Sequence, residues 1–246
     1  MRAAVPIVLL LVCAAAGARA QTTPTAEDLL KAADRARGGL EKGITWEVKL
    51  VASEDGDRSE RTFVVRARGD NANVESLAPP RTKGEVMLFN DRTIWYVKPG
   101  LRKPISISAR QKLSGLAANG DIASTQYARD YAGTVAGEET VDGVKTWKLE
   151  LKAKAGNVTY DRIRYWIAQE QRLGVKAEFL TVDGKVFKTA TFQYTNKLTV
   201  DGAEQAFVSA MNIVDASSQD TTEIRYGTPR AEEHAASMFN VNNIVR

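Results

Sequence analysis

The chain has 246 residues, and its 34 lysines and arginines against 30 aspartates and glutamates give a formal net charge of +4. Because charges of both signs are mixed along the chain, the charge gives no case for binding nucleic acid or an anionic membrane surface. One cysteine, Cys13, and one histidine, His234, leave little for disulfides, zinc sites or histidine-dependent catalysis. The length is enough for one large all-β domain.

The first twenty residues predict a secretory signal peptide. Arg2 precedes an apolar run over residues 3–16, and Ala18-Arg19-Ala20 supplies a small-residue cleavage pattern. The run is shorter than the roughly 18 residues that a transmembrane anchor needs. An alternative is a lipid-modified Cys13, but the residue before it is not small, as such processing requires. Cleavage after Ala20 leaves residues 21–246 as a single domain with no cysteine and a formal charge of +2, so no disulfide can stabilise it.

The amino-terminal part predicts one helix followed by strands. Thr25 with Asp28 three residues later opens a helix that ends at Gly38-Gly39. From Thr45 to Ala52 apolar and polar residues alternate, which is typical of a half-buried antiparallel strand. The pattern continues through Arg61–Arg68 and Asn73–Ala78, so these three segments predict a meander.

The stretch from Ser76 to Tyr131 joins β-patterned segments to a long polar interlude. Glu85–Phe89 and Thr93–Lys98 predict a hairpin, and Pro104–Ser108 predicts a further strand. From there to Arg129 the residues are too polar for a core strand and favour one or two short amphipathic helices. We therefore predict a helical lid insert at about residues 108–130, hinged at one side near Pro104 or Ser108 and at the other near Asp130.

The remainder returns to strands separated by short turns and closes with a predicted helix over Arg230–Phe239. In total we predict mainly β structure with some α: roughly eleven antiparallel strands and no strand–helix–strand alternation, which argues against a doubly wound fold. A sheet of this width must curl, and curling produces a concave face. If its own side chains do not fill that face, it forms a lipid-sized pocket.

Catalytic and metal-binding patterns are missing from the sequence. His234 is interpreted as a surface residue of the closing helix, and no G-x-S-x-G turn accompanies it. No acidic residues have metal-ligand spacing, and no glycine-rich phosphate loop is present. Basic and aromatic residues interleave over Tyr160–Trp166, which could indicate stacking on nucleic acid, but strand alternation explains them. We therefore expect a binding protein that is not an enzyme and has no cofactor, metal or nucleic-acid partner.

Several short motifs form a specific set between Ser76 and Tyr226. They are Leu77-Ala78-Pro79-Pro80, Lys83-Gly84, Trp95, Arg102-Lys103-Pro104-Ile105, Asn119-Gly120-Asp121-Ile122-Ala123, Asp130-Tyr131, Gly137-Glu138-Glu139, Asp142-Gly143, Thr159-Tyr160, Arg162-Ile163 and Lys176-Ala177-Glu178-Phe179. With these residues the chain resembles the periplasmic outer-membrane lipoprotein-sorting proteins, the LolA-like carriers. The resemblance is to the branch found near RND-type lipid exporters in particular.

This resemblance implies an unclosed β-barrel, as in LolA and LolB, with helices covering its concave face, a hydrophobic cavity for acyl chains, and no catalysis. It also implies a monomeric periplasmic carrier that moves a lipid or lipoprotein between an inner-membrane exporter and an outer-membrane acceptor. Carriers of this family tie the lid shut with a cavity arginine, and Arg68 is the nearest match. Gly69 stands where those carriers have a proline.

Two other functions stay open from the sequence: a periplasmic module that senses a lipid or peptide and reports to a membrane regulator, and a hydrolase of unusual design. We expect Leu113, Leu116 and Ile122 to cover the cavity, although they could instead pack on the sheet as fixed core. The full set of candidate cavity and lid residues is Arg68, Leu88, Ile94, Trp95, Tyr96, Leu113, Leu116, Ile122, Trp147, Leu149 and Phe179.

Overall fold

The structure is a computed structural model that describes residues 23–101, 103–123 and 126–244. The predicted signal peptide and its cleavage after Ala20 lie outside the described residues. Across the part of the chain that is described, no helix is long and apolar enough to cross a membrane.

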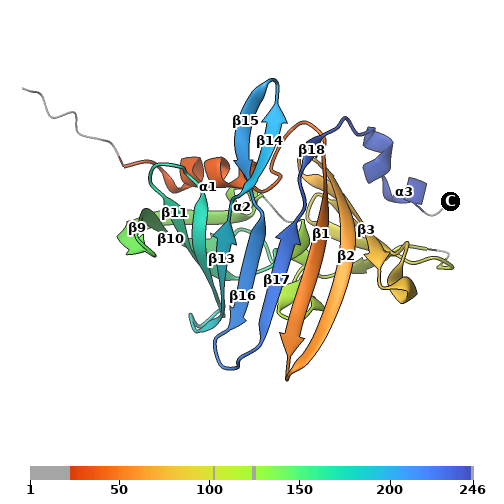
Figure 1. Ribbon diagram of the computed structural model, residues 1–246, viewed down its shortest axis with the longest axis horizontal. Coiled ribbons are helices and arrows are strands. Elements are labelled where there is room, and N and C mark those ends of the chain that lie inside the picture. Colours follow the sequence, from red (N-terminus) through yellow and green to blue (C-terminus); the bar gives the residue numbers. More distant parts are fainter. Residues whose placement is uncertain (1–22, 102, 124–125, 245–246) are drawn as a thin grey trace, which may run out of the picture.

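A curled antiparallel sheet of fourteen strands forms most of the molecule (Figure 1). Its order is β6-β5-β4-β3-β2-β1-β17-β16-β13-β12-β11-β10-β9, with β18 also paired to β1. The strands of this sheet are β1 (Ile44–Glu54), β2 (Asp57–Arg68), β3 (Asn71–Ala78), β4 (Val86–Asn90), β5 (Thr93–Val97), β6 (Ile105–Ile107), β9 (Tyr131–Val141), β10 (Val144–Ala153), β11 (Arg162–Ala168), β12 (Gly174–Leu180), β13 (Val186–Gln193), β16 (Ala210–Asp215), β17 (Thr221–Tyr226) and β18 (Arg230–Ala231). The order ends at β6 and β9, so the barrel is not closed, which confirms the predicted fold class.

Two small hairpins and six short or medium helical segments complete the fold. The hairpins pair β7 with β8 and β14 with β15. Their bounds and those of the helices are β7 (Lys112–Ser114), β8 (Ala117–Ala118), β14 (Asn196–Val200), β15 (Ala203–Phe207), α1 (Ala26–Arg35), η1 (Pro80–Thr82), η2 (Asn119–Ile122), α2 (Tyr127–Asp130), η3 (Ala236–Phe239) and α3 (Val241–Ile244), where η denotes a 3₁₀ helix.

Alternating burial explains how the long strands form. In β1 the side chains of Trp46, Val48 and Leu50 are buried on one face, as the sequence predicts. In the register of β1 with β2, Val48 lies opposite Phe63, so apolar side chains of both strands meet on the concave side. The strands turn at Asp-Gly pairs such as Asp142-Gly143, where both residues have positive φ, as a two-residue hairpin turn requires. These turns therefore set the register that puts the apolar residues inside.

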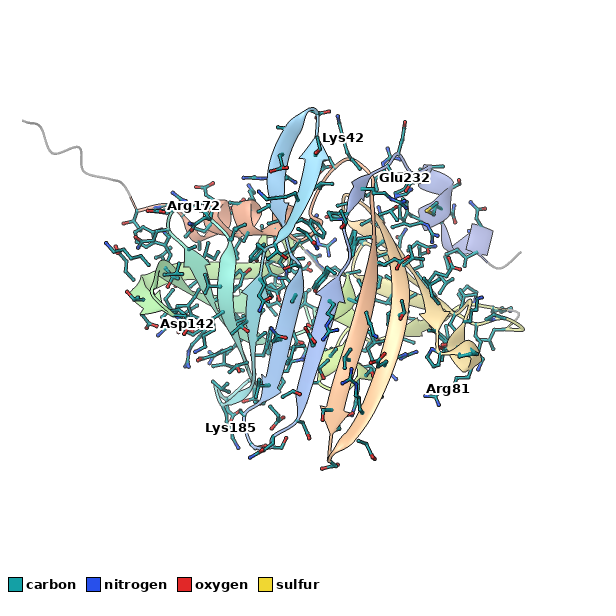
Figure 2. All side chains as sticks on the ribbon, viewed as in Figure 1. Lys42, Arg81, Asp142, Arg172, Lys185 and Glu232 are labelled. Atoms are coloured by element: carbon teal, nitrogen blue, oxygen red, sulfur yellow. The ribbon has the colours of Figure 1, made fainter. Side chains whose placement is uncertain are left out.

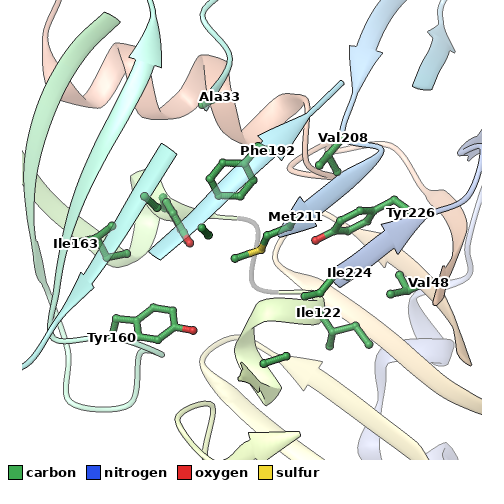
Figure 3. Packing of buried hydrophobic residues seen from close by; sticks show 14 of the residues in the cluster. Ala33, Val48, Ile122, Tyr160, Ile163, Phe192, Val208, Met211, Ile224 and Tyr226 are labelled. Carbon is green, nitrogen blue, oxygen red and sulfur yellow. The ribbon is translucent and has the colours of Figure 1, made fainter. Parts of the chain in front are cut away.

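Helix α1 lies over the concave side of the sheet, where Ala33 stands above Phe192 (Figure 3). Thr25 caps the helix, since its Oγ1 accepts a hydrogen bond from the backbone N–H of Asp28 at 3.1 Å. Leu29 and Leu30 are fully buried. The predicted amino-terminal helix is confirmed, and with it one hydrophobic cluster extends from α1 to β17.

Charged side chains gather at the turns and edges (Figure 2). Lys42, Asp142 and Lys185 are exposed at different margins of the molecule. Much of the mixed charge that the sequence indicates is therefore on the outside, and the apolar core cluster lies on the concave side together with a few buried charged groups such as Asp121 and Lys188.

Three predicted details are wrong. The main sheet has fourteen strands against the roughly eleven expected; β6 matches the predicted strand Pro104–Ser108, whereas β18, of two residues, shows no recognisable alternation. The insert at 108–130 is not mainly helical: it holds the β7–β8 hairpin, η2 and the single turn α2. Instead of a helix over 230–239, the chain pairs as β18 with the start of β1 and then forms η3.

His234 is also not a surface residue, since it is only 3% exposed. Its Nε2 lies 3.0 Å from Thr45 Oγ1 and 3.3 Å from the carbonyl oxygen of Ile44. The backbone at Glu232 passes close to Gly43: a Cβ atom on Gly43 would lie 2.0 Å from the carbonyl oxygen of Glu232. This close approach of two backbones buries the imidazole against β1 and prevents the segment from forming a helix there.

Candidate functional site

The segment between β6 and β9 runs through the concave side of the sheet, and we call residues 108–123 and 126–130 the strap. Its middle is deeply buried: Ala117, Asp121 and Ile122 are almost inaccessible to solvent. Ile122 lies beside Ile224 in the packed centre of the molecule (Figure 3). The strap therefore occupies part of the concave face that an open barrel would expose.

One end of the strap is tied to β2 and β17 by hydrogen bonds. Arg61 Nη1 donates to the carbonyl oxygen of Leu113 at 2.8 Å, and the backbone N–H of Leu116 donates to Thr222 Oγ1 at 2.8 Å. Between them Gly115 has a φ of +56°, and a Cβ there would meet Ala52 Cβ at 2.4 Å. A glycine is required at this point both by the left-handed backbone and by the contact with the sheet.

A buried polar latch holds the middle of the strap, and it consists of Asp121, Lys188 and Tyr160. Lys188 Nζ on β13 donates to Asp121 Oδ2 at 3.2 Å and to the carbonyl oxygen of Leu116 at 2.7 Å. Tyr160 Oη donates to the same carboxylate at 2.6–2.7 Å, and the backbone N–H of Ala118 completes its partners at 2.9 Å. Burial, and then the neighbouring Asp121, raise the pKa of Tyr160 well above its ordinary value, so the phenol stays a donor. Both oxygens of the carboxylate thus have partners, and the ammonium uses two of its three N–H donors.

The last turn of the strap, α2, is anchored on α1. Asp34 Oδ2 accepts a hydrogen bond from the backbone N–H of Ala128 at 2.9 Å. Burial raises the pKa of Asp34 to about 7, against the opposing effect of the hydrogen bonds from Ala128 and Tyr127. Near pH 7 this anchor is therefore only partly ionised.

A pocket of about 290 Å³ lies between the first half of the strap and strands β2 to β6. Burial, followed by the hydrogen bond with Glu85, raises the pKa of Tyr96 in this pocket to about 12. About half of its lining residues are apolar and the others are polar or charged; it comprises Arg61, Phe63, Val74, Ser76, Glu85, Met87, Tyr96, Ile105, Ile107, Gln111, Lys112, Leu113 and Asn119. The volume is at the lower end of the range of roughly 300–1,000 Å³ for small-molecule sites.

The structure brings together only two of the candidate residues in this pocket, Tyr96 and Leu113. Leu116 and Trp147 are partly buried and pack against the core cluster, and Leu116 lines a separate hollow of about 720 Å³ with Lys188. The remaining apolar candidates are buried rather than arranged around one cavity; they are Leu88, Ile94, Ile122, Leu149 and Phe179. For Ile122 the alternative of fixed core packing is therefore the observed one.

Arg68 does not have the position that the resemblance implies. It is exposed, lines a hollow of about 740 Å³ with Trp95 and the carboxy-terminal segment, and donates to the carbonyl oxygen of His234 at 3.0 Å. Strand alternation separates it from the buried Phe63 and Val65, whereas Arg61 shares their side of β2. Arg61 contacts the first half of the strap, as Arg92 contacts its end at Asp130, and the same alternation could have identified Arg61 from the sequence.

Sequence reasoning missed most of the apolar lining of the pocket. Phe63, Val74 and Met87 come from β2, β3 and β4 on their inward faces, and Ile105 and Ile107 come from β6. The alternation of apolar and polar residues in the first three strands could have indicated which side chains, such as Phe63 and Val74, point inward. Among the described residues no group of three or more histidine, cysteine, aspartate or glutamate side chains is placed to hold a metal ion.

Proteins of similar structure are known for most of the length of this chain. A family model described as an uncharacterized protein matches residues 69–246, and a search of curated proteins finds no match. A LolA superfamily protein from Nitrosomonas europaea is 26% identical, with a TM-score of 0.80 over 89% of this chain and 99% of that one.

Two further solved structures are similar in fold. A putative outer membrane lipoprotein-sorting protein domain from Vibrio parahaemolyticus is 19% identical, with a TM-score of 0.74 over 89% of this chain and 98% of that one. A DUF1329 family protein from Desulfovibrio piger is 20% identical, with a TM-score of 0.72 over 89% of this chain and 97% of that one. At these identities the likeness concerns the fold alone.

Proposed function

Because the chain belongs to the LolA-like family, we propose that it is a periplasmic carrier that binds acyl chains beneath the strap and moves a lipid or lipoprotein between the two membranes. An inner-membrane exporter would supply the cargo and an outer-membrane acceptor would receive it. The predicted cleavage after Ala20 supports a periplasmic location. The proposal includes no catalytic step.

The observation that carries the proposal is the pocket between the strap and strands β2 to β6, whose lining includes the apolar side chains of Phe63, Val74 and Met87. Removing acyl methylenes from water yields about 0.8 kcal/mol each, so some ten methylenes supply about 8 kcal/mol for binding. A pocket of about 290 Å³ is small for such a chain, so the strap has to move to enlarge it.

The way in which the strap is held supports this movement. Polar contacts tie the strap to the sheet, among them those of Arg61 and Lys188, and such contacts can break and re-form. Much of the surface beneath it is apolar, as shown by Phe63, Val74 and Met87 in the pocket. A ligand that binds the uncovered state better than the covered one shifts the equilibrium towards the uncovered state by its difference in affinity.

Native mass spectrometry of the purified mature protein, followed by titration with a fluorescent fatty-acyl probe, tests the proposal. We expect co-purified lipid or uptake of one acyl probe per chain. A double variant, Leu113→Ser with Leu116→Ser, should weaken binding about tenfold or more, since these side chains contribute apolar area at the strap. Ile122 is left unchanged because its burial makes a serine there disruptive.

The matched control is Val182→Ser, which removes an apolar side chain that is 73% exposed and outside the strap. It should bind the probe like the unaltered protein. A folded protein that contains no lipid and takes up no acyl chain would contradict the carrier proposal. Equal affinity in the strap variant and the control would contradict the role of the strap.

A further inference from the structure

A positive charge lies inside the core at Arg37, which follows α1 and is only 2% exposed. Its guanidinium carbon is 4.8 Å from the ring centre of Tyr127 and 5.0 Å from that of Phe192. Arg37 Nη1 has no hydrogen-bond partner in the described part of the chain. Aromatic faces attract a cation but do not neutralise it, and a buried charge is costly unless it is paired. The site therefore has an unused capacity to bind an anion.

Two more unpaired donors belong to the same aromatic cluster. The hydroxyl groups of Tyr165 and Tyr194 are buried without a hydrogen bond of ordinary geometry among the described residues, although weaker contacts join the Tyr194 hydroxyl to that of Tyr165 and to the backbone of Gly174. The ring of Tyr165 lies 5.6 Å from that of Tyr127 and 6.0 Å from that of Phe192, the two rings that flank the guanidinium. Burial raises the pKa of Tyr194 to about 12, so its phenol is a donor at neutral pH.

The acidic side chain of Asp34, which interacts electrostatically with Arg37, supplies only part of the missing negative charge. Asp34, in the last turns of α1, already accepts the hydrogen bond from the backbone N–H of Ala128. Because burial raises its pKa to about 7, much of the Asp34 population is neutral at that pH. Arg37 thus lacks a full counter-ion within the protein.

The strap forms one wall of this cluster, because Tyr127 is the first residue of α2. Any movement of the strap that takes α2 away from α1 removes Tyr127 from the guanidinium. Arg37 would then face the interior that the strap covers, with Phe192 and Tyr165 still behind it. An acyl ligand lying in that interior could place its head group against the arginine.

We propose that Arg37, with the hydroxyl groups of Tyr165 and Tyr194, binds the carboxylate of a single-chain fatty acid. The planar guanidinium matches a carboxylate in a bidentate arrangement, and two phenols can donate to the same oxygens. A carboxylate is also the smallest of the acidic lipid head groups, which suits a site enclosed by aromatic rings. This inference rests on the proposed carrier function and adds that the cargo is acidic.

Displacement of a fluorescent acyl probe by dodecanoate and by dodecanol, which share a chain length, tests the inference. The unaltered protein should bind dodecanoate about tenfold tighter or more, as expected for hydrogen bonds to charged groups. Arg37→Met should bind both ligands with equal affinity. Arg37→Lys keeps the charge without the planar fork and should retain part of the preference, whereas the exposed Arg230→Met is the control and should retain all of it.

Equal binding of dodecanoate and dodecanol by the unaltered protein would overturn the inference and leave the carrier function standing. If neither ligand binds, the carrier function fails and this inference fails with it. Removing an unpaired buried charge should not impair folding. If Arg37→Met nevertheless does not fold, Tyr194→Phe replaces it: a reduced preference for dodecanoate supports the inference, and an unchanged preference counts against it.

Discussion

Breaking the latch between Asp121 and Lys188 should loosen the strap and destabilise the whole protein. The two side chains are only 2% and 5% exposed, so neither charge can be solvated when the other is lost. Asp121→Asn leaves the Lys188 ammonium with the carbonyl oxygen of Leu116 and with the ring of Tyr160 at 4.7 Å. Lys188→Met leaves the carboxylate with Tyr160 and the backbone N–H of Ala118.

Removing one partner of a buried ion pair typically costs 3–5 kcal/mol. Because each remaining group of this latch keeps some hydrogen bonds, we expect about 3 kcal/mol for either single variant. The double variant, Asp121→Asn with Lys188→Met, leaves no uncompensated charge. It should therefore lose far less than the sum of the single variants, with a coupling free energy of about 2 kcal/mol or more.

Urea unfolding of the four proteins at pH 7 measures this coupling. The exposed pair Lys197 and Glu204, joined at 3.1 Å, supplies the control cycle, which should show no measurable coupling. If the losses from the two single latch variants add to within about 0.5 kcal/mol in the double variant, the latch does not act as a unit and the reasoning is refuted.

Three further predictions concern the strap, its anchor and α1. Gly120→Ala should lower the free energy of unfolding by about 1–3 kcal/mol, because the new Cβ would meet Thr159 Oγ1 at 1.9 Å. Gly156→Ala is the control and should cause no such loss, since a Cβ there has no other atom within 4 Å. Urea unfolding midpoints of the two variants test this difference. Burial raises the pKa of Asp34 to about 7 from an ordinary 3.8. The neutral carboxyl therefore stabilises the folded protein fully below about pH 4, and this contribution is lost as the pH rises to about 7. The stability difference between the unaltered protein and Asp34→Asn should fall across that window and stay constant above it; a difference independent of pH contradicts the shift. Thr25→Ala should cost about 1 kcal/mol in urea unfolding, and no loss would show that the cap is dispensable.

The sequence predicts the parts of the fold that local patterns determine. Strand β1, the Asp142-Gly143 turn and the helix capped by Thr25 are each determined by a few neighbouring residues. The predicted open, curled sheet follows from the number of such strands. These elements are confirmed because the same residues that favour each local conformation also bury its apolar face.

The strap could not be predicted from local pattern. Its elements are two to four residues long, too short to show a helical or strand period. Its conformation depends instead on distant partners: Asp121 and Lys188 are 67 residues apart in the sequence. Some of the polar residues that indicate an exposed amphipathic helix, Asn119, Asp121 and Asp130, are in fact buried and hydrogen-bonded inside the molecule.

The candidate site was predictable only in part. Tyr96 and Leu113, two of the candidate residues, both line the pocket. Arg61 holds the strap in place of Arg68 because its side of β2, rather than its distance from the aromatic hairpin, determines what it contacts. The unpaired donor of Arg37 has no signature in the sequence, since its environment is assembled from α1, α2, β11 and β13.

Hydrogen exchange of the strap amides, measured with and without a saturating fatty-acyl ligand, tests most directly the claim that the strap moves to admit an acyl chain. The account predicts that the ligand binds and that the amides of residues 115–122 then exchange faster, while those of β1 and β17 stay protected. An acyl ligand that binds with no change in strap exchange, or one that does not bind at all, would contradict it.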